Sequence, residues 1–559
     1  MDSVGKSTAS RPASLERNDP RGPAPQPAGP SCPPVHPQLR RLQTAPPGRS
    51  SAPHRSDLRR SRSDISETLG HDRRLVVVSN RVVDPDKPAA GGLAVALGEM
   101  MHDSAALWFG WSNKTTSDSA PAMVKTQPFG RTTLAQVDLS QEHHDGYYAG
   151  FSNSVLWPVF HDKVKWVDLN PAHFKAYKEV NRMMASQLAP MLKDNDVLWI
   201  HDYHLIPFAQ ELRKLGCKQR MGFFNHIPLP SPEVIKQIPQ HRELMEALMS
   251  YDLIGMQSPK DVENLRLYAE TEDVGRLVDE GPELDAFGKR AVVQAFPIGI
   301  DVENLKELVP GEGSKKVLDE VRAEAGKRML MVGVDRLDYT KDVPGRLKAF
   351  RKLLEDQPHL RNRVTMVQIA APTRGAVPAY ARLSRKTKKL VDEINAQFGT
   401  GEWQPVMYKN EPVDRSALPE IYRLSQVGVV TPVADGMNLV AKEYIAAQHP
   451  ENPGVLVLST GAGAAAQLSQ SILVPPKDKG AMAKAYARAL TMPLDERQRR
   501  HAELFENVEQ QDLPWWRQNY LAALAKNQLA ASAGEDSPEH ESTSSTSSSG
   551  HRAESGARG

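Results

Sequence analysis

Polar and charged side chains gather in three short stretches, each directly after an apolar run typical of a buried strand. These stretches are Ser79-Asn80-Arg81, His201-Asp202-Tyr203-His204 and Asn225-His226. Arginine presents a planar set of donors, aspartate accepts hydrogen bonds, and histidine can do either. Such groups bind anions and sugar hydroxyls, so their chemistry indicates a small, hydroxyl-rich or phosphorylated ligand.

His201 and His204 could instead be metal ligands. The sequence places no thiolate near them and offers no clear third ligand, so hydrogen bonding to sugar hydroxyls is the favoured interpretation. For His226 taken alone, a ring that is satisfied only by backbone groups is an alternative that stays open.

A fourth stretch, Asp335-Arg336-Leu337-Asp338-Tyr339-Thr340-Lys341, follows the apolar run 329–334. Arg336 and Lys341 flank one loop, so a guanidinium and an ammonium can converge on one diphosphate. The later loop 431–439 leads into a helix whose first N–H groups favour the same phosphates. These two loops predict a nucleotide-diphosphate site.

Two weaker signals accompany that site. Glu443 in the helix after 431–439 could accept both ribose hydroxyls, although for a lone glutamate, pairing with a surface cation at i,i+4 is the favoured interpretation. Gly91-Gly92 precedes a helical run that begins at Leu93, where backbone N–H groups could approach a phosphate. Plain turn geometry is the alternative for these glycines.

The elements that must position these residues are short β-branched apolar runs alternating with helical patterns. Such runs belong to parallel sheets covered on both faces. One series of strands covers 75–78, 197–200, 221–224, 253–256 and 292–296, and a second covers 329–334, 364–369, 427–430 and 455–458. Helical patterns at 344–356, 378–397, 438–448 and 480–491 separate the second series. We therefore predict an α/β protein with two doubly wound, Rossmann-like domains facing a central cleft.

The predicted division of the chain follows the composition. It comprises a disordered Pro/Arg/Ser-rich tail (1–72), an N-terminal Rossmann-like domain (73–299), a C-terminal Rossmann-like domain (300–505), a helix packing back across the junction (506–528) and a disordered Ser-rich tail (529–559). The tails lack the apolar residues that would offset the entropy of ordering them. The basic N-terminal tail could contact an acidic partner or mimic a transit peptide, but its prolines disfavour the helix that a transit peptide uses.

Composition excludes several classes of protein. Lys+Arg total 70 and Asp+Glu total 68, so the net charge indicates neither a nucleic-acid partner nor a membrane surface. The only cysteines, Cys32 and Cys217, do not suggest a disulfide framework. No apolar run is long enough for a membrane span or a signal peptide. We expect a cytoplasmic protein without membrane or nucleic-acid partners.

The motifs together resemble those of the trehalose-6-phosphate synthases, which are retaining glycosyltransferases of the GT-B fold. The resemblance covers roughly residues 74 to 526. Its longest motifs are Val77-Val78-Ser79-Asn80-Arg81, Trp108-Phe109-Gly110-Trp111, Trp199 to Leu205, Arg336-Leu337-Asp338-Tyr339, and Asp435 to Glu443.

The resemblance implies roles for individual residues. The acceptor, glucose 6-phosphate, would be held by Arg81, Tyr148, Trp157, Asp202 and Arg374. The nucleotide sugar would be held by Gly92, His226, Arg336, Lys341, Asp435, Met437, Asn438, Leu439 and Glu443. The residues implied at the catalytic centre are Arg336, Lys341, Asp435, His226 and Asp202. No metal ligand and no cofactor are implied.

The implied activity is transfer of glucose from UDP-glucose, or another nucleoside-diphosphate glucose, to glucose 6-phosphate, which forms α,α-trehalose 6-phosphate. The preferred base stays open between UDP, ADP and GDP. A synthase with another phosphorylated acceptor, such as glycerol 3-phosphate, and a non-catalytic regulatory homologue are the alternatives. A protein that binds a partner through its basic tail is a third. The family also suggests a homo-oligomer, either a dimer or a tetramer.

Two positions depart from the family pattern. Asp342 follows Lys341 where glycine is common, and its carboxylate could weaken the positive field near the diphosphate. Asn225 precedes His226 where an apolar residue is usual, which leaves the orientation of the His226 ring open.

Overall fold

The computed structural model describes residues 65–70, 72–84, 92–117, 123–278, 281–373 and 378–532. All of these belong to one compact unit, Arg55–Gly559. The predicted tails up to residue 64 and from residue 533, and the predicted acceptor residue Arg374, lie outside the described residues.

Both predicted tail boundaries need a correction. Helix α2 (Ile65–Leu69) falls within the predicted N-terminal tail, and helix α19 (Leu513–Ser532) extends past residue 529. The two helices contact each other. Leu69 is buried in the same apolar cluster as Leu521 and Leu524 of α19, so even a short helix buries apolar surface here.

The first sheet has ten strands in the order β3-β4-β2-β1-β5-β6-β7-β10-β9-β8. From β4 to β10 all neighbours are parallel, whereas β3, β9 and β8 add antiparallel edges. The strands are β1 (Arg74–Arg81), β2 (Leu107–Thr116), β3 (Lys125–Phe129), β4 (Thr132–Ser140), β5 (Asp196–His201), β6 (Arg220–Phe224), β7 (Leu253–Met256), β8 (Gly275–Leu277), β9 (Glu283–Ala286) and β10 (Lys289–Ala295).

Both faces of this sheet are buried, because alternate side chains of its central strands enter different apolar clusters. Val76 and Val78 of β1 face one cluster, whereas Leu75 and Val77 face the other. The first cluster draws on α6 (Pro171–Leu188), α7 (Phe208–Lys214), α8 (Pro232–Ile235), α9 (His241–Leu248) and α10 (Pro259–Thr271). The second draws on α3 (Gly92–Asp103) and α19.

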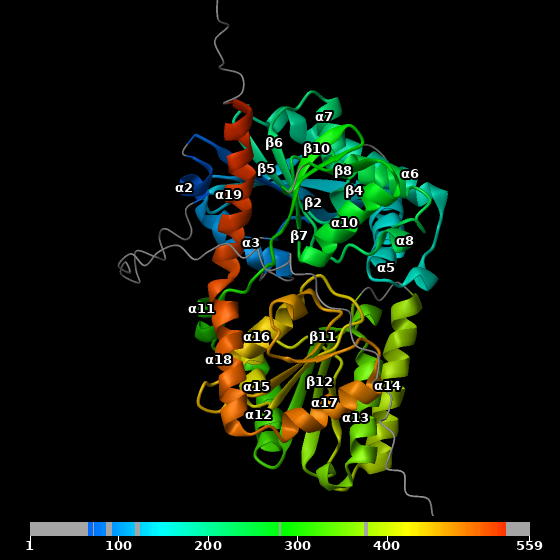
Figure 1. The fold of residues 1–559 in the computed structure, drawn as a ribbon, viewed down its shortest axis with the longest axis vertical. Coiled ribbons are helices and arrows are strands. Elements are labelled where there is room, and N and C mark those ends of the chain that lie inside the picture. The colour runs from blue at the N-terminus through cyan, green and yellow to red at the C-terminus, as the bar shows by residue number, and fades with distance from the viewer. Residues whose placement is uncertain are drawn as a thin grey trace, which may run out of the picture. The chain divides into compact units, whose positions relative to one another are not determined.

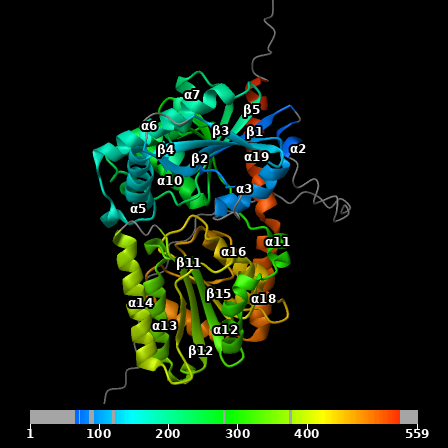
Figure 2. The ribbon, with the colours of Figure 1, turned by 180° about the vertical axis from the view of Figure 1, so that it is seen from behind.

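The second sheet has six parallel strands in the order β13-β12-β11-β14-β15-β16. They are β11 (Met329–Arg336), β12 (Val364–Ala371), β13 (Val406–Lys409), β14 (Val427–Val430), β15 (Val455–Ser459) and β16 (Ile472–Val474). One face is covered by α13 (Val343–Asp356), α14 (Pro378–Phe398) and α17 (Lys479–Leu490). The other is covered by α11 (Val302–Glu307), α12 (Lys315–Ala325), α15 (Leu418–Arg423), α16 (Leu439–Ala447) and α18 (Leu494–Gln510), as Figures 1 and 2 show from opposite sides.

The chain crosses from one sheet to the other twice. After β10, the backbone N–H of Ile298 donates to Oε1 of Gln257 at 3.1 Å, and the Ile298 carbonyl accepts from Nζ of Lys442 in α16 at 2.8 Å. The second passage leads from α18 into α19, which lies beside the first sheet (Figure 1). There Tyr520 stacks on Trp199 with ring centres 4.7 Å apart.

All nine strands expected from apolar runs are present, and the predicted doubly wound α/β architecture is confirmed. The prediction missed β2, β3 and β4 near one edge of the first sheet and β8 and β9 at its other edge. It also missed two short edge strands of the second sheet, β13 and β16. The predicted boundary between the two domains and the cytoplasmic location stay predictions. Within the described ranges, no helix combines the length and the apolar character that crossing a membrane requires.

Candidate active site

Arg81 is the last residue of β1, and its guanidinium contacts two aromatic rings. Its Cζ lies 4.9 Å from the ring centre of Trp111 in β2 and 4.7 Å from that of Tyr148. Cation–π contacts orient a guanidinium without neutralising it. Because Arg81 is also exposed, its charge can still pair with an anion such as phosphate.

Tyr148 comes from a π-helix, η2 (His144–Leu156), that continues into the short helix α5 (Trp157–Phe160). Its ring stacks on that of His204 with centres 5.8 Å apart and planes inclined by 11°. Trp157 starts α5, is nearly buried, and lies 4.1 Å from the ring of His161. One continuous helical segment therefore supplies both aromatic residues predicted for the acceptor site.

Asp202 connects the ends of two neighbouring strands. Its backbone N–H donates to the carbonyl of Phe224 at 2.8 Å, and its Oδ1 accepts from the backbone N–H of His226 at 3.2 Å. Its φ of 78° lies in a sparsely populated region for a non-glycine residue, a kind of strain that clusters at functional sites. Asp202 and His226 are thus adjacent, because they follow the carboxyl ends of the neighbouring strands β5 and β6.

The rings of His201 and His226 contact each other, with Nδ1 of His201 3.1 Å from Nε2 of His226. Burial lowers the pKa of His226 to about 3 and the pKa of His201 well below its usual value, so both rings are neutral near pH 7. In the described part of the chain, no group of three or more His, Cys, Asp or Glu side chains is arranged to hold a metal ion.

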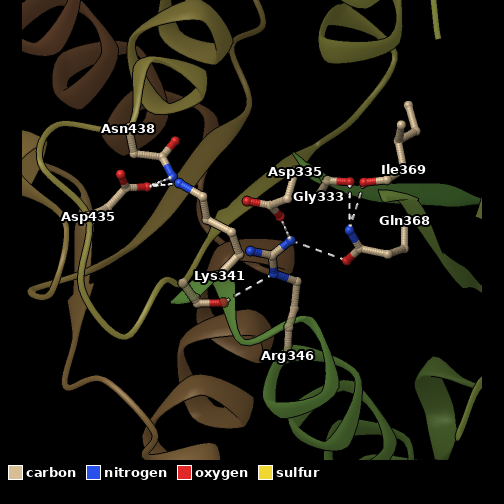
Figure 3. Close-up of polar contacts among 9 residues, drawn as sticks. Gly333, Asp335, Lys341, Arg346, Gln368, Ile369, Asp435 and Asn438 are labelled. Atoms are coloured by element: carbon tan, nitrogen blue, oxygen red, sulfur yellow. Dashed lines mark hydrogen bonds and ion pairs between the residues drawn. The ribbon is translucent and has the colours of Figure 1, made fainter. Parts of the chain in front are cut away.

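At the second sheet, Arg336 ends β11 with an exposed side chain, and Lys341 closes the 3₁₀ turn η7 (Tyr339–Lys341). Nζ of Lys341 forms an ion pair with Oδ2 of Asp435. Nδ2 of Asn438 donates to the same oxygen at 2.9 Å (Figure 3). Three of the predicted donor residues therefore form one connected polar group.

A buried arginine lies beneath this group. Arg346 of α13 is fully buried, and its guanidinium pairs with Asp335 and donates to Oγ1 of Thr431 at 3.1 Å and to Oε1 of Gln368 at 3.2 Å (Figure 3). Asp335 immediately precedes Arg336, and Thr431 begins the loop 431–439. Arg346 therefore braces the starts of both predicted diphosphate-binding loops.

The remaining donor residues surround the start of α16. Met437 is buried, and Leu439, the first residue of the helix, is half-buried. Glu443 accepts a hydrogen bond from Tyr422 Oη at 3.3 Å, and burial raises its pKa against the opposing charge of Arg415. Glu443 is half-buried, which disfavours the alternative that it pairs with a surface cation.

Loops from the two sheets touch at Gly436. A Cβ added there would lie 2.0 Å from the carbonyl oxygen of His226, so only glycine permits this approach. A second contact joins Trp166 to Tyr339, whose rings stack with centres 4.7 Å apart. The loop that carries Asp435 and Asn438 is thus brought against the strand ends that carry Asp202 and His226.

The two departures from the family pattern have structural roles. Asp342 has a φ of 48°, where glycine is favoured and aspartate is tolerated, and its Oδ1 caps α13 by accepting from the N–H of Gly345 at 3.2 Å. Asn225 donates from Nδ2 to the carbonyl of Ile227 at 2.7 Å and from its backbone to that of Gly255 at 2.9 Å. Asn225 therefore holds the turn that contains His226.

Gly92, the last of the predicted residues, begins α3, and Gly91 lies outside the described residues. Sequence reasoning did not identify Trp111, Arg346 or Lys442 as neighbours of the site. Trp111 belonged to a recognised motif, but no sequence signal shows that a ring will lie against Arg81. Lys442 also belonged to a recognised motif, and Arg346 to none, but in both cases burial depends on tertiary contacts that the sequence does not show.

Known proteins similar to this chain share its architecture. The sequence matches glycosyltransferase family 20 over residues 71–526. The trehalose-6-phosphate synthase of Sodalis glossinidius is 42% identical over 459 residues, which is 81% of this chain and 96% of that protein.

Solved structures agree. The UDP-forming α,α-trehalose-phosphate synthase of Burkholderia vietnamiensis superposes with a TM-score of 0.79 at 42% identity, covering 82% of this chain and 98% of that one. The corresponding enzyme of Burkholderia xenovorans, solved in complex with glucose-6-phosphate, has a TM-score of 0.76 at 43% identity, covering 81% and 99%. These likenesses confirm the predicted GT-B fold, and the chain belongs to glycosyltransferase family 20.

Proposed function

We propose that this chain transfers glucose from a nucleoside-diphosphate glucose, with UDP-glucose the favoured donor, to glucose 6-phosphate. The products are α,α-trehalose 6-phosphate and the free nucleoside diphosphate. Support comes from relatives named trehalose-6-phosphate synthase, from solved relatives described as UDP-forming, and from one that was solved with glucose-6-phosphate.

The observation that carries the proposal is the contact between Gly436 and His226. It brings the cation-bearing loops of the second sheet against the strand ends of the first. A donor diphosphate and a phosphorylated acceptor can then bind on opposite sides of one reaction centre, as transfer between two bound substrates requires.

In this proposal the acceptor is held at the first sheet. Arg81 and Arg374 bind its phosphate, Tyr148 and Trp157 line the wall beside it, and Asp202 accepts from sugar hydroxyls. The aromatic setting of Arg81 supports this role, since Trp111 and Tyr148 hold the guanidinium in one orientation.

The donor is held at the second sheet. Arg336 and Lys341 bind the diphosphate, Glu443 accepts from the ribose, and Asp435 fixes the Lys341 ammonium. The other proposed donor contacts come from Gly92, His226, Met437, Asn438 and Leu439. The ion pair between Lys341 and Asp435 supports this division of roles, because it fixes the ammonium in the loop that faces His226.

The proposed reaction proceeds with retention. The acceptor hydroxyl oxygen bonds to the anomeric carbon while the bond from that carbon to the diphosphate oxygen breaks on the same face. Because attack and departure share one face, no enzymic nucleophile is needed. The hydroxyl proton passes to the departing phosphate oxygen, so no enzymic base is needed either. Arg336 and Lys341 stabilise the charge that accumulates on the diphosphate.

We also propose that transfer needs no resident metal, because Arg336 and Lys341 supply positive charge at the diphosphate. Full activity in the presence of EDTA would support this, whereas activity restored only by a divalent cation would contradict it. A homo-oligomer, either dimer or tetramer, is proposed from the family resemblance, and light scattering after size-exclusion chromatography tests it.

A product assay tests the function. The purified chain is offered UDP-, ADP- and GDP-glucose separately, each with glucose 6-phosphate or with glycerol 3-phosphate, and products are identified by mass spectrometry. A disaccharide phosphate that requires glucose 6-phosphate is expected. Product only with glycerol 3-phosphate would indicate the alternative acceptor, and no product with any pair would favour a regulatory homologue.

The proposed role of Arg336 has its own test. Arg336→Ala is expected to lose roughly 10²–10³ in kcat, the usual scale for one electrostatic stabiliser. Arg290→Ala is the control, since Arg290 is an exposed arginine near the amino end of β10, whereas the proposed site lies at the carboxyl ends of the strands. Activity of the Arg336 variant within a few-fold of the control would refute the role.

A further inference from the structure

Two neutral imidazoles lie side by side beneath the proposed donor site. His201 ends β5 and is fully buried, and His226 follows the neighbouring strand β6. The strands pair in parallel with His201 opposite Phe224, which places the two histidines next to each other. Nδ1 of His201 is 3.1 Å from Nε2 of His226, a hydrogen-bonding distance.

The surroundings of the pair are mainly aromatic. The ring of Trp199 lies 4.6 Å from that of His201, and Phe224 and Trp516 lie 4.7 Å and 6.1 Å from the ring of His226. This apolar setting lowers both pKa values and keeps both rings neutral. A neutral imidazole has one N–H and one acceptor nitrogen, so one ring donates to the other.

The surroundings of the other ring nitrogen of His201 decide which ring donates the hydrogen bond. Its Nε2 is buried, and no polar atom of the described residues lies within hydrogen-bonding distance of it. A proton on this nitrogen would be a buried N–H without an acceptor, and buried donors are left unpaired in proteins more rarely than buried acceptors. His201 therefore carries its proton on Nδ1, and this N–H donates a hydrogen bond to Nε2 of His226. His226, in turn, must carry its own proton on Nδ1.

We propose that His201 is a positioning residue that fixes His226 in its Nδ1–H tautomer, so that His226 presents a neutral hydrogen-bond donor to an oxygen of the nucleotide sugar. Contact between His226 and the donor rests on the proposed function, whereas the tautomer does not. The backbone of His226 is fixed as well, since its N–H donates to Asp202.

This assignment limits what His226 can do. Its Nε2 already accepts a hydrogen bond from Nδ1 of His201 and therefore cannot act as a general base. Because the ring is neutral, it adds no charge at the diphosphate, and the positive charge there must come from Arg336 and Lys341. His226 instead contributes orientation through one N–H whose direction the protein sets in advance.

Nuclear magnetic resonance of the full chain with ¹⁵N-labelled histidine tests the tautomer directly, because protonated and unprotonated ring nitrogens resonate at different ¹⁵N shifts. His201→Asn and His226→Gln assign the two rings. Both rings are expected to be protonated on Nδ1. A proton on Nε2 of His226 in the wild-type spectrum would overturn the proposal.

Activity provides the second readout. His201→Leu, which removes the donor, is expected to lower kcat about 10- to 100-fold, the range seen when a partner that orients a functional histidine is removed. His201→Asn should recover most of this loss, because its amide can donate from nearly the position of Nδ1. The acceptor KM should not change, since the defect concerns the donor side.

His501→Leu is the matched control, because His501 is also buried but bonds to the carbonyl of Ile445 in the second sheet's helical layer. Equal losses in the His201→Leu and His501→Leu variants would reduce His201 to a packing role and overturn the proposal. If the wild-type chain shows the expected tautomer but makes no trehalose 6-phosphate, the proposed function fails and the positioning of His226 stands.

Discussion

Replacement of Arg346 by methionine should destabilise the second sheet through one buried carboxylate. The guanidinium is fully buried and pairs with Asp335, whose side chain is only 3% exposed. It also donates to Thr431 and Gln368 (Figure 3). Methionine fills much of the same volume without the charge, so the main change is that Asp335 loses its partner.

The magnitude follows from that isolated charge. Removing one partner of a buried ion pair costs about 3–5 kcal/mol, because the other charge stays desolvated and uncompensated. The double variant Asp335→Asn/Arg346→Met removes both charges, and replacing a whole buried pair is often close to neutral. We therefore expect the free energy of unfolding to fall by about 3–5 kcal/mol in the single variant and to recover most of this in the double variant.

The deficit should depend on pH. Burial already raises the pKa of Asp335 while Arg346 and Lys341 oppose this, so loss of Arg346 raises it further. An acid whose pKa is higher in the folded state stabilises the fold below its unfolded pKa of about 3.9, and this stabilisation is lost as pH rises through the folded value. The difference between wild type and Arg346→Met should thus shrink from pH 7 towards pH 5.

Urea unfolding followed by tryptophan fluorescence and by circular dichroism measures these differences. Arg322→Met is the control, since Arg322 is half-exposed and its ion pair with Glu420 lies on the surface, where such pairs contribute about 0–1 kcal/mol. A loss below about 1 kcal/mol in Arg346→Met, or a double variant that is less stable than the single one, would refute the reasoning.

Two further predictions concern the contacts between the sheets. Burial lowers the pKa of Lys442 to about 7 from 10.5, so its charged form destabilises the fold below the unfolded pKa. Between pH 7 and pH 10, the free energy of unfolding of wild type relative to Lys442→Met should therefore rise by about 3–4 kcal/mol in urea unfolding. A difference that stays constant with pH would contradict this. Gly436→Ala should lower kcat/KM about 10²-fold in the product assay, because its Cβ would collide with the backbone of His226. Gly480→Ala, whose Cβ makes only ordinary van der Waals contact, is the control and should not lower it. Equal activity of the two variants would refute the contact.

The strands of both sheets could be predicted because fully buried parallel strands are written as continuous apolar runs. β2 carries that signature over its first half, because Leu107, Trp108 and Phe109 are apolar and buried, and the prediction overlooked it. β3 lacks the signature, since none of its residues is buried. Such strands exist because a neighbour supplies their hydrogen bonds, and that information is not local.

The proposed acceptor wall was accessible only through family resemblance. Tyr148 and Trp157 lie in a π-helix and its continuation, whose geometry leaves no distinctive periodicity in a short segment. By contrast, Arg81, Asp202 and Arg336 follow apolar strands, and the carboxyl ends of parallel strands are where doubly wound folds bind ligands. Position in the fold therefore identified some site residues on physical grounds, and only recognised motifs identified the others.

Buried cations were beyond sequence reasoning for a different cause. Lysine and arginine are rarely fully buried, so Lys442 and Arg346 would be assigned to the surface by their type. Arg346 is buried because Asp335 and Gln368 bond to it there, and Lys442 because the carbonyl of Ile298 accepts a hydrogen bond from its Nζ. Each burial depends on residues far away in the sequence.

The groups near the proposed diphosphate site also show how the starts of helices α13 and α16 differ in their side-chain caps. Arg346 is paired with Asp335 and Lys341 with Asp435, so Arg336 supplies the least compensated side-chain charge of the three. Asp342 caps α13 by accepting from the N–H of Gly345. The N-cap of α16, Asn438, makes no such bond to its helix and donates to Asp435 instead. In the proposed site, the start of α16 can therefore add its dipole to the charge of Arg336 at the donor diphosphate.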